Sequence, residues 1–282
     1  MKNQSAEKLS GPYVGPRPIQ AGEPLFGREK EKAELSNLLR ARRVILLHSP
    51  SGAGKTSLIQ AGLIPVLRGE GFQVLPVIRL NQFPPPGLSF DPNLFNRYLF
   101  SALFSLESGK DLPLQKRLSL AELIHLSEQA DGFEKYLESR SSRQTARRKA
   151  VSNRKVLIFD QFEEILTIDP VSLEERKDFF VRLAPVLGNY AYWVKFAMRE
   201  DFIAGLEPYL SYFPERLGVR FRLEFLTKKP ALQAIQNPAR RFKVEFENEA
   251  AQQLVNDLSK ITIQEMGKPK EVEGYNVEPV QL

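Results

Sequence analysis

An eight-residue stretch, Ser49 to Thr56, most constrains what this chain can fold into. It reads Ser-Pro-Ser-Gly-Ala-Gly-Lys-Thr and fits the pattern G-x-x-x-x-G-K-[ST], except that a serine stands at the position of the first glycine. The apolar run Val44–Leu47 precedes it, and apolar residues at helical spacing follow it. A buried parallel strand, a glycine-containing loop and a helix in this order predict a phosphate-binding loop.

Each residue type in this loop has a physical reason. The glycines at 52 and 54 let the backbone curl, so that successive N–H groups point at phosphate oxygens. Lys55 is expected to reach the β- and γ-phosphates, and the Thr56 hydroxyl to bind magnesium. A strand-to-helix turn without any ligand is the alternative. The expected nucleotide-binding residues of the loop are Ser49, Pro50, Ser51, Gly52, Ala53, Gly54, Lys55, Thr56 and Ser57.

The composition excludes several other kinds of site. The 282 residues include no cysteine and two histidines, which excludes disulfides and thiolate metal sites and disfavours a histidine-based zinc site. No apolar run approaches the ~18 residues of a membrane span, and residues 1–10 lack the apolar core of a signal peptide. We therefore expect a cytoplasmic protein with no membrane span.

The net charge of +6 raises the question of a nucleic-acid partner. Much of the excess lies in residues 140–155, which contain seven basic and no acidic residues. No aromatic residue interrupts this segment, so it offers no platform on which bases stack. A solvated loop is the favoured interpretation, and a patch that follows phosphates or binds a partner is the alternative. Nucleic acid is disfavoured as a partner.

Alternating apolar runs and helical patterns predict a doubly wound α/β domain with a mainly parallel sheet. We expect an extended lead-in over 1–24, a nucleotide-binding domain over 25–226 with an insertion at about 83–153, and a purely helical, truncated subdomain over 227–282. Strands are expected over 43–48, 74–80, 156–159, 194–198 and 221–225. Helices are expected over 29–39, 54–68 with a kink or early end at Pro65, 94–106, 118–126 and after a Ser172–Glu175 capping box.

Acidic and basic residues follow two of these strands. Asp160 ends the run Val156–Phe159, and a carboxylate at the carboxyl end of a parallel strand can bind magnesium in such enzymes. Glu163 or Glu164 is expected to accept the proton of an attacking water. Arg199 ends the next strand and is expected to neutralise the γ-phosphate. The alternatives are helix capping or exposure to solvent for the acids, and for Arg199 an ion pair with Glu200, Asp201 or the Glu163–Glu164 pair.

Three segments resemble the STAND class of P-loop NTPases, the signal-transduction ATPases related to AAA+ and NLR-type switches. They are Leu25-Phe26-Gly27-Arg28-Glu29, Asp160-Gln-Phe-Glu-Glu164 and Met198-Arg-Glu-Asp-Phe202. The resemblance covers about residues 12–282 and indicates a bacterial member. It implies that Phe26, Gly27 and Arg28 contact adenine and that Arg199 senses the γ-phosphate. It does not decide between the two glutamates, although it slightly favours Glu164.

The end of the chain resembles the family segment whose proline, here Pro279, contacts the base side of the nucleotide. We expect that the sequence is a piece of a longer protein. The resemblance implies an ATP-binding, slowly hydrolysing switch that uses ATP, ADP and magnesium and self-associates on activation. The alternatives are a module that holds ADP without turnover and a nucleic-acid-associated ATPase.

Overall fold

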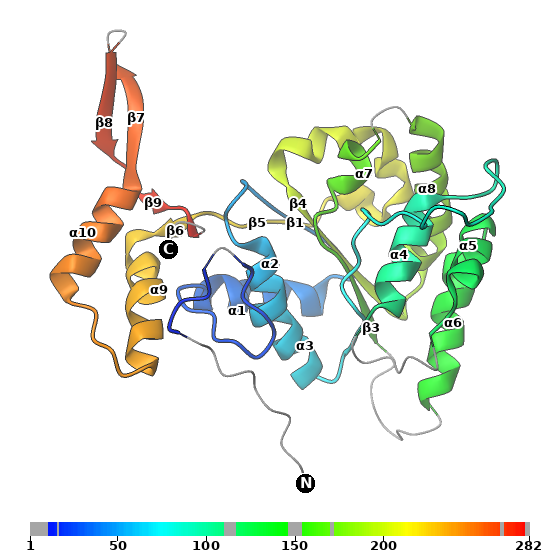
Figure 1. Cartoon of the computed structure of the whole chain (residues 1–282), viewed down its shortest axis with the longest axis horizontal. Coiled ribbons are helices and arrows are strands. Elements are labelled where there is room, and N and C mark those ends of the chain that lie inside the picture. Colours follow the sequence, from blue (N-terminus) through cyan, green and yellow to red (C-terminus); the bar gives the residue numbers. More distant parts are fainter. Residues whose placement is uncertain are drawn as a thin grey trace. The chain divides into compact units, whose positions relative to one another are not determined.

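The computed structural model describes residues 11–15, 17–109, 117–145, 154–169, 172–265 and 268–279. The chain forms two compact units (Figure 1), which are described separately. One comprises Met1–Leu38, Ser49–Val66 and Arg222–Leu282, and is called the loop unit below. The other comprises Leu39–His48 and Leu67–Phe221, and is called the sheet unit.

A five-stranded parallel sheet with the order β2-β3-β4-β1-β5 forms the centre of the sheet unit. In the best-paired part, Lys155 lies opposite Tyr192 and Phe159 opposite Phe196. The expectation of an α/β fold with a parallel sheet is confirmed. The strands are β1 (Val44–Ser49), β2 (Gln73–Val74), β3 (Lys155–Phe159), β4 (Tyr192–Arg199) and β5 (Arg220–Arg222).

Burial of both sheet faces explains the apolar runs of these strands. Every residue of β3 is buried, as parallel strands covered by helices require. Phe159 stacks on Phe196 with ring centroids 5.1 Å apart, and Phe179 and Phe180 of α8 are fully buried in the same cluster. The helices of this unit are α4 (Arg97–Glu107), α5 (Leu120–Glu128), α6 (Gly132–Thr145), α7 (Glu164–Thr167) and α8 (Leu173–Gly188), followed by 3-10 helices over Glu200–Tyr212 and Pro214–Leu217.

Two expectations for the sheet needed correction. The second strand was expected over 74–80, but β2 ends at Val74 and pairing resumes only as a single bridge between Ile78 and Phe159. Pro76 lies between Val74 and Ile78. It has no N–H to donate to the neighbouring strand, which explains the interruption in strand pairing. The strand expected over 221–225 ends at Arg222 as β5, and β6 (Leu226–Thr227) begins only after that range and belongs to another sheet.

The helix after the loop does not end early at Pro65. It runs through α2 (Lys55–Ser57), a π-helical segment (Leu58–Leu63) and α3 (Ile64–Gly69). Since Pro65 has no N–H to donate to the carbonyl four residues earlier, the irregularity takes the form of a wider turn just before it. There the Ile64 N–H donates to the Ile59 carbonyl.

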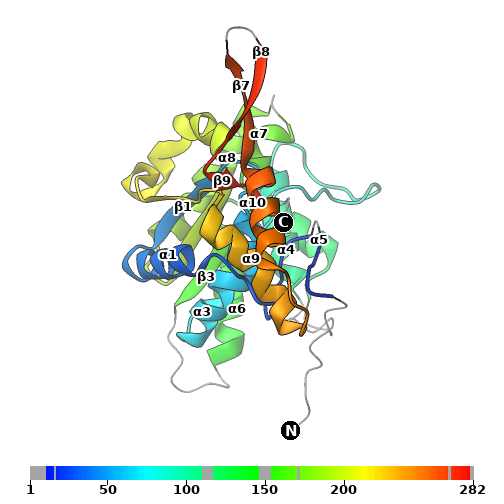
Figure 2. The same cartoon turned by 90° about the vertical axis from the view of Figure 1, so that its left-hand side faces the viewer.

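The expectation that residues beyond Lys228 form helices alone is wrong. The helices α9 (Lys228–Arg241) and α10 (Asn248–Ser259) are followed by a hairpin of β7 (Lys260–Glu265) and β8 (Lys268–Glu273). β9 (Asn276–Val277) then pairs with β6. Figures 1 and 2 both show the hairpin extending away from α9 and α10. The alternation Lys-Ile-Thr-Ile-Gln-Glu is a strand pattern, and the helical periodicity of the preceding residues does not extend into it.

α1 (Glu29–Ala41) completes the helices and begins where expected.

The helix starts also differ in detail from the sequence patterns. Ser172 lies at the start of α8 and its hydroxyl contacts the Glu175 carboxylate at 3.0 Å, but it makes no hydrogen bond to a backbone N–H. The expected capping box is therefore incomplete there. A complete one is present at α5, where Ser119 and Glu122 each bond the other's backbone.

Candidate functional site

The expected phosphate-binding loop begins where β1 ends at Ser49. Gly52 and Gly54 have φ angles of 76° and 89°, in the left-handed region that residues with a Cβ rarely adopt. The helix begins directly afterwards, at Lys55. When residues of such a turn are left-handed, successive backbone N–H groups point inward and form a nest that binds anions. Ala53 is fully buried, whereas Ser51 is exposed.

Lys55 is held inside this loop by its own neighbours. Its side chain is only 9% exposed, and its Nζ donates to Ser49 Oγ at 2.7 Å and to the Pro50 carbonyl at 3.4 Å. The Ser49 hydroxyl donates to the same Pro50 carbonyl at 2.7 Å. The serine at the first loop position thus gives the ammonium group a polar partner that a glycine there would lack.

Arg28 holds the loop from its buried side. Its side chain is 4% exposed and donates to the carbonyls of Ala53 and Glu224, at 2.9 Å and 2.8 Å, and to the Glu31 carboxylate at 2.6 Å. Burial lowers the pKa of this guanidinium, and the hydrogen bond to Glu31 opposes that shift. Arg28 was expected to contact adenine, whereas in this structure its guanidinium fixes the loop backbone.

Other expected residues of the loop unit are buried or half-buried. Phe26 is half-buried, and Gly27 is buried so close to Pro230 that a Cβ there would lie 2.4 Å from that carbonyl oxygen. Thr56 is half-buried in the first turn of the helix, and Ser57 Oγ accepts the Ile19 N–H at 3.1 Å.

The chain after β9 returns to the loop. A Cβ placed on Gly52 would lie 1.9 Å from Glu278 Oε1, and one placed on Gly54 would lie 3.9 Å from Pro279 Cβ. The expected base-side residue Pro279 therefore lies beside the phosphate loop. The contact of Glu278 with Gly52 had no signal in the sequence, since it depends on a chain reversal more than two hundred residues away.

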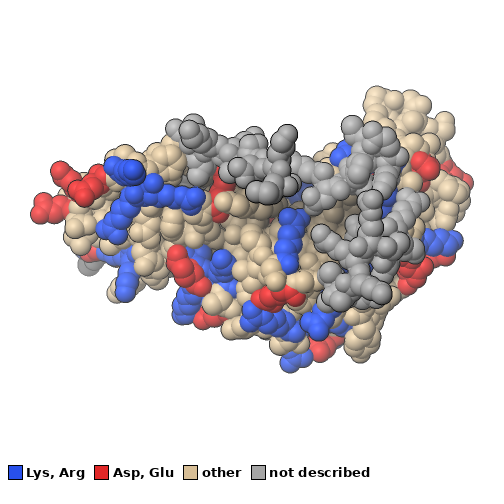
Figure 3. All heavy atoms as spheres, turned by 90° about the horizontal axis from the view of Figure 1, so that it is seen from below, with Lys and Arg blue, Asp and Glu red and all other residues tan. Residues whose placement is uncertain are grey.

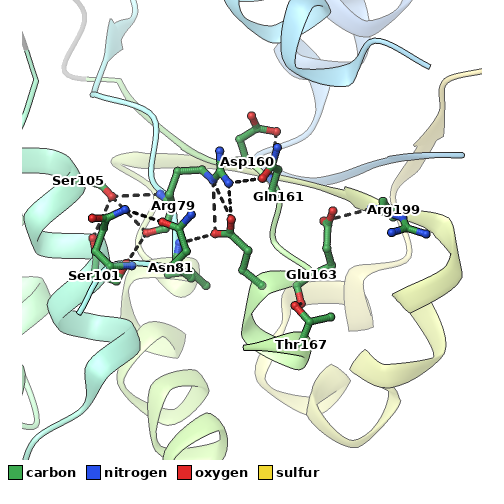
Figure 4. Close-up of polar contacts among 12 residues, drawn as sticks. Arg79, Asn81, Ser101, Ser105, Asp160, Gln161, Glu163, Thr167 and Arg199 are labelled. Atoms are coloured by element: carbon green, nitrogen blue, oxygen red, sulfur yellow. Dashed lines mark hydrogen bonds and ion pairs between the residues drawn. The ribbon is translucent and has the colours of Figure 1, made fainter. Parts of the chain in front are cut away.

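In the sheet unit, Asp160 lies directly after β3 (Figure 4) and is 3% exposed. Its N–H donates to the Ile78 carbonyl at 3.0 Å, and its Oδ1 accepts the Gln161 N–H at 3.0 Å. Gln161 adopts a left-handed conformation with φ of 55°, which is uncommon for a residue with a side chain. Asp160 thus ends its strand in a tight, strained turn.

The two candidate bases have different partners. Glu164 Oε1 and Oε2 lie 3.1 Å and 3.3 Å from Arg79 Nε, and Oε2 also accepts the Leu80 N–H at 2.9 Å. Glu163 Oε2 accepts the backbone N–H of Arg199 at 3.2 Å. Figure 4 shows the Glu163 side chain directed at Arg199. Glu164 is thus held at the segment that follows β2, and Glu163 at the end of β4.

The Arg199 side chain forms a local ion pair. Its Nη2 donates to Asp201 at 2.7 Å, and its guanidinium carbon lies 5.1 Å from the centre of the Phe202 ring. This is one of the alternatives that the sequence left open, and it places a half-exposed cation beside Glu163. The ends of β3 and β4 thus bring Glu163 and Arg199 into contact, while Asp160 begins the turn after β3 that leads to Glu164.

The sequence interpretation missed Arg79, which bonds both Glu164 and the Gln161 side chain. A signal was present, because Arg79 directly follows the apolar pair Val77-Ile78, as Asp160 follows its own apolar run. Polar residues at the carboxyl ends of parallel strands meet at one edge of a sheet. The broken strand at Pro76 concealed this position.

Comparison with known proteins gives the family. The family described as novel STAND NTPase 1 matches residues 12–268. The chain belongs to this family. The resemblance to the STAND class seen in the sequence is confirmed, and the protein is a nucleotide-binding NTPase of the STAND type. No match was found among curated proteins.

Solved structures share the fold of this STAND NTPase. A Walker-type ATPase of Pyrococcus abyssi is 18% identical with a TM-score of 0.55, over 86% of this chain and 65% of its own. The ORC2 protein of Aeropyrum pernix in its ADP form is 15% identical with a TM-score of 0.53, over 84% and 59% respectively. At these identities the likeness shows the fold alone. The chain spans less than two thirds of the length of either protein.

Two other kinds of feature are absent from the described part of this STAND NTPase. None of its helices there combines the length and apolar character that crossing a membrane requires. The same residues contain no cluster of three or more His, Cys, Asp or Glu side chains arranged to hold a metal ion.

The basic segment 140–155 is not a uniform solvated loop. Arg140 lies in α6 and forms an ion pair with the buried Glu107, and Lys155 is a buried residue of β3. Residues 146–153 lie outside the described part. On the face shown in Figure 3, basic and acidic side chains are interspersed over the residues described. This charge distribution offers no broad cationic surface there.

We predict that Arg28→Ala lowers the free energy of unfolding by about 2–3 kcal/mol, because the Ala53 and Glu224 carbonyls lose a charged donor. ATP affinity should fall as well, since the loop loses its anchor. Urea unfolding and calorimetric titration measure the two effects. Arg17→Ala removes an exposed arginine whose ion pair with Glu23 contributes at most about 1 kcal/mol. Equal behaviour of the two variants would contradict the anchoring role.

Proposed function

We propose that this chain is an ATP-binding and slowly hydrolysing molecular switch, part of a larger signalling or defence protein. The observation that carries the proposal is the phosphate loop. Two left-handed glycines, a buried lysine on a local hydroxyl and the start of a helix occur together between Ser49 and Thr56. Membership of the STAND NTPase family supports a nucleoside triphosphate as the ligand, and the residues of the loop are suited to binding its phosphates.

Nucleotide binding in this proposal exchanges one set of partners for another. The Lys55 ammonium leaves the Ser49 hydroxyl and the Pro50 carbonyl for β- and γ-phosphate oxygens. The exchange is favourable because a charge-assisted bond to an anion is stronger than a bond to a neutral oxygen. Ser49 then serves as the resting acceptor that keeps a buried lysine paired between binding events. Phe26 and Pro279 are the residues proposed to contact the adenine.

Magnesium is proposed to be held by Thr56 and Asp160, with the nucleotide phosphates completing its coordination. Hydroxyl and carboxylate oxygens are the ligands that this ion prefers, and it commonly uses only one or two protein ligands together with phosphates and water. When bound, the ion neutralises charge that develops on the phosphate oxygens.

Glu163 is the residue we propose as the general base. Both oxygens of Glu164 already accept hydrogen bonds from Arg79 and Leu80, which gives that carboxylate a structural task. Glu163 projects from the turn after β3 and is fixed by the backbone of Arg199. In this arrangement Glu163 accepts the proton of the attacking water, while the Arg199 side chain exchanges Asp201 for the γ-phosphate.

The switch itself follows from differential binding. ATP favours one arrangement of the chain and ADP another, and a ligand shifts such an equilibrium only by its difference in affinity for the two forms. We propose that the ATP form of the full-length protein self-associates. Slow hydrolysis then acts as a timer that returns the protein to its resting form.

We predict that Lys55→Ala lowers ATP affinity at least about tenfold, because the phosphates lose a charge-assisted partner that contributes about 1.5–3 kcal/mol. Isothermal titration with ATP and with ADP measures this loss. Lys30→Ala is the matched control, since Lys30 is an exposed lysine of α1 with a side chain 82% accessible. Unchanged ATP affinity in Lys55→Ala would remove the basis of the proposed function.

We predict that Glu163→Gln leaves ATP binding intact and slows hydrolysis by about 10²–10⁴-fold, as expected for loss of a general base. Glu164→Gln should slow it less. Single-turnover hydrolysis of radiolabelled ATP separates the chemical step from binding. A larger effect of Glu164→Gln would reverse the assignment of the base. If neither variant changes turnover, the chain holds its nucleotide without a hydrolytic cycle.

A further inference from the structure

One arginine connects three separate segments at the edge of the sheet. The Arg79 guanidinium bonds the Gln161 side-chain oxygen and both carboxylate oxygens of Glu164 (Figure 4). The neighbouring Leu80 N–H donates to the same carboxylate at 2.9 Å. All of these groups belong to the sheet unit. Arg79 therefore fixes the turn after β3 at two points, one residue and four residues beyond Asp160.

The backbone of Arg79 is itself held by α4. The Arg79 carbonyl accepts hydrogen bonds from the hydroxyls of Ser101 and Ser105, at 2.8 Å and 3.2 Å. Its N–H donates to Ser105 Oγ at 3.1 Å. Because the two serines are four residues apart, they lie on one face of the helix. The guanidinium thus projects from a backbone segment that has little freedom to move.

The turn that Arg79 holds is a strained one. Gln161 has a φ of 55°, and a residue with a side chain persists in this strained region only where its surroundings hold it there. The Gln161 N–H also donates to Asp160 Oδ1 at 3.0 Å. The left-handed conformation of Gln161 therefore sets the direction in which the Asp160 carboxylate is held, and a partner for the Gln161 side chain is needed to keep it.

We infer that Arg79 is a positioning residue for Asp160. It contacts neither phosphate nor metal, but it keeps Gln161 left-handed by binding the Gln161 side chain while Glu164 neutralises its charge. The Asp160 carboxylate is thereby preorganised as a magnesium ligand. This inference rests on the proposed function, because it requires Asp160 to bind the ion.

A purely structural ion pair makes a different prediction. Arg79 and Glu164 side chains are 32% and 12% exposed, and a pair this accessible stabilises a fold only slightly. Its loss would lower stability a little and leave magnesium dependence unchanged. A positioning role instead weakens metal binding, because residues that orient a metal ligand typically contribute about 10–100-fold to affinity.

The test compares Arg79→Ala, Arg79→Lys and the double variant Arg79→Ala with Gln161→Gly. Calorimetry gives ATP affinity over a series of magnesium concentrations and ADP affinity without magnesium. Urea unfolding of the nucleotide-free proteins shows whether each variant is folded. The control is Arg140→Ala, which breaks the more deeply buried ion pair with Glu107 in the same unit.

Arg79→Ala should raise the magnesium concentration for half-maximal ATP binding at least about tenfold, with metal-free ADP affinity unchanged. Arg79→Lys should not restore the original magnesium dependence, because a single ammonium group does not reproduce the planar guanidinium that reaches both Gln161 and Glu164. Gln161→Gly should recover much of the loss and raise the urea midpoint in the Arg79→Ala background, because glycine adopts this φ without strain. Arg140→Ala should leave the magnesium dependence unchanged.

Two failures are distinguishable. If the unchanged protein binds ATP with magnesium and folded Arg79→Ala has the same magnesium dependence, the positioning role is wrong and the proposed function stands. The positioning role is equally wrong if Gln161→Gly gives no recovery of metal dependence. If the unchanged protein shows no magnesium-dependent ATP binding, both the proposed function and the role of Arg79 are wrong.

Discussion

Burial of both faces of the β3–β4 pair is the constraint on which the sheet unit depends. Five residues of β3 pair in register with β4, and the stacked Phe159 and Phe196 continue into the aromatic cluster beneath α8. An unpaired polar side chain is costly inside this layer, and its two buried lysines, Lys155 and Lys195, donate to backbone carbonyls. The side chains of Asp160, Glu163 and Arg199 therefore occur where the strands end, which is also where parallel sheets of this class bind their ligands.

Each unit has an arginine, buried or half-buried, that fixes a turn carrying candidate site residues. Arg28 bonds the Ala53 carbonyl within the phosphate loop, and Arg79 bonds Gln161 and Glu164 after β3. A guanidinium suits this task because it presents several donors in a rigid plane and stays charged when buried. In both places a turn with left-handed residues is held by side-chain bonds from a distant segment. Such turns cost conformational energy and persist where the surroundings determine them.

Hydrogen bonds also give side chains of one type different surroundings. Glu163 and Glu164 are adjacent and chemically identical, yet one contacts the backbone at the end of β4 and the other a guanidinium and an N–H after β2. Lys55 is likewise distinguished from the exposed lysines by its bond to Ser49. This bond pairs its ammonium within the loop, so the buried charge is not left unsatisfied.

The sequence by itself determined the α/β fold, the phosphate loop, the family and the strand-end positions of Asp160 and Arg199. These follow from local patterns, because a buried parallel strand needs an apolar run and a phosphate loop needs glycines, a lysine and a hydroxyl in fixed order. Pro76 in the break of β2 and the strand alternation after α10 were also present in the sequence but were not recognised there, whereas only the tertiary structure decided the anchoring bonds of Arg28 and the partners of the two glutamates. These depend on contacts between residues far apart in the chain, such as Arg79 with Glu164 and Gly52 with Glu278, and no local periodicity encodes which distant side chain will satisfy a given hydrogen bond.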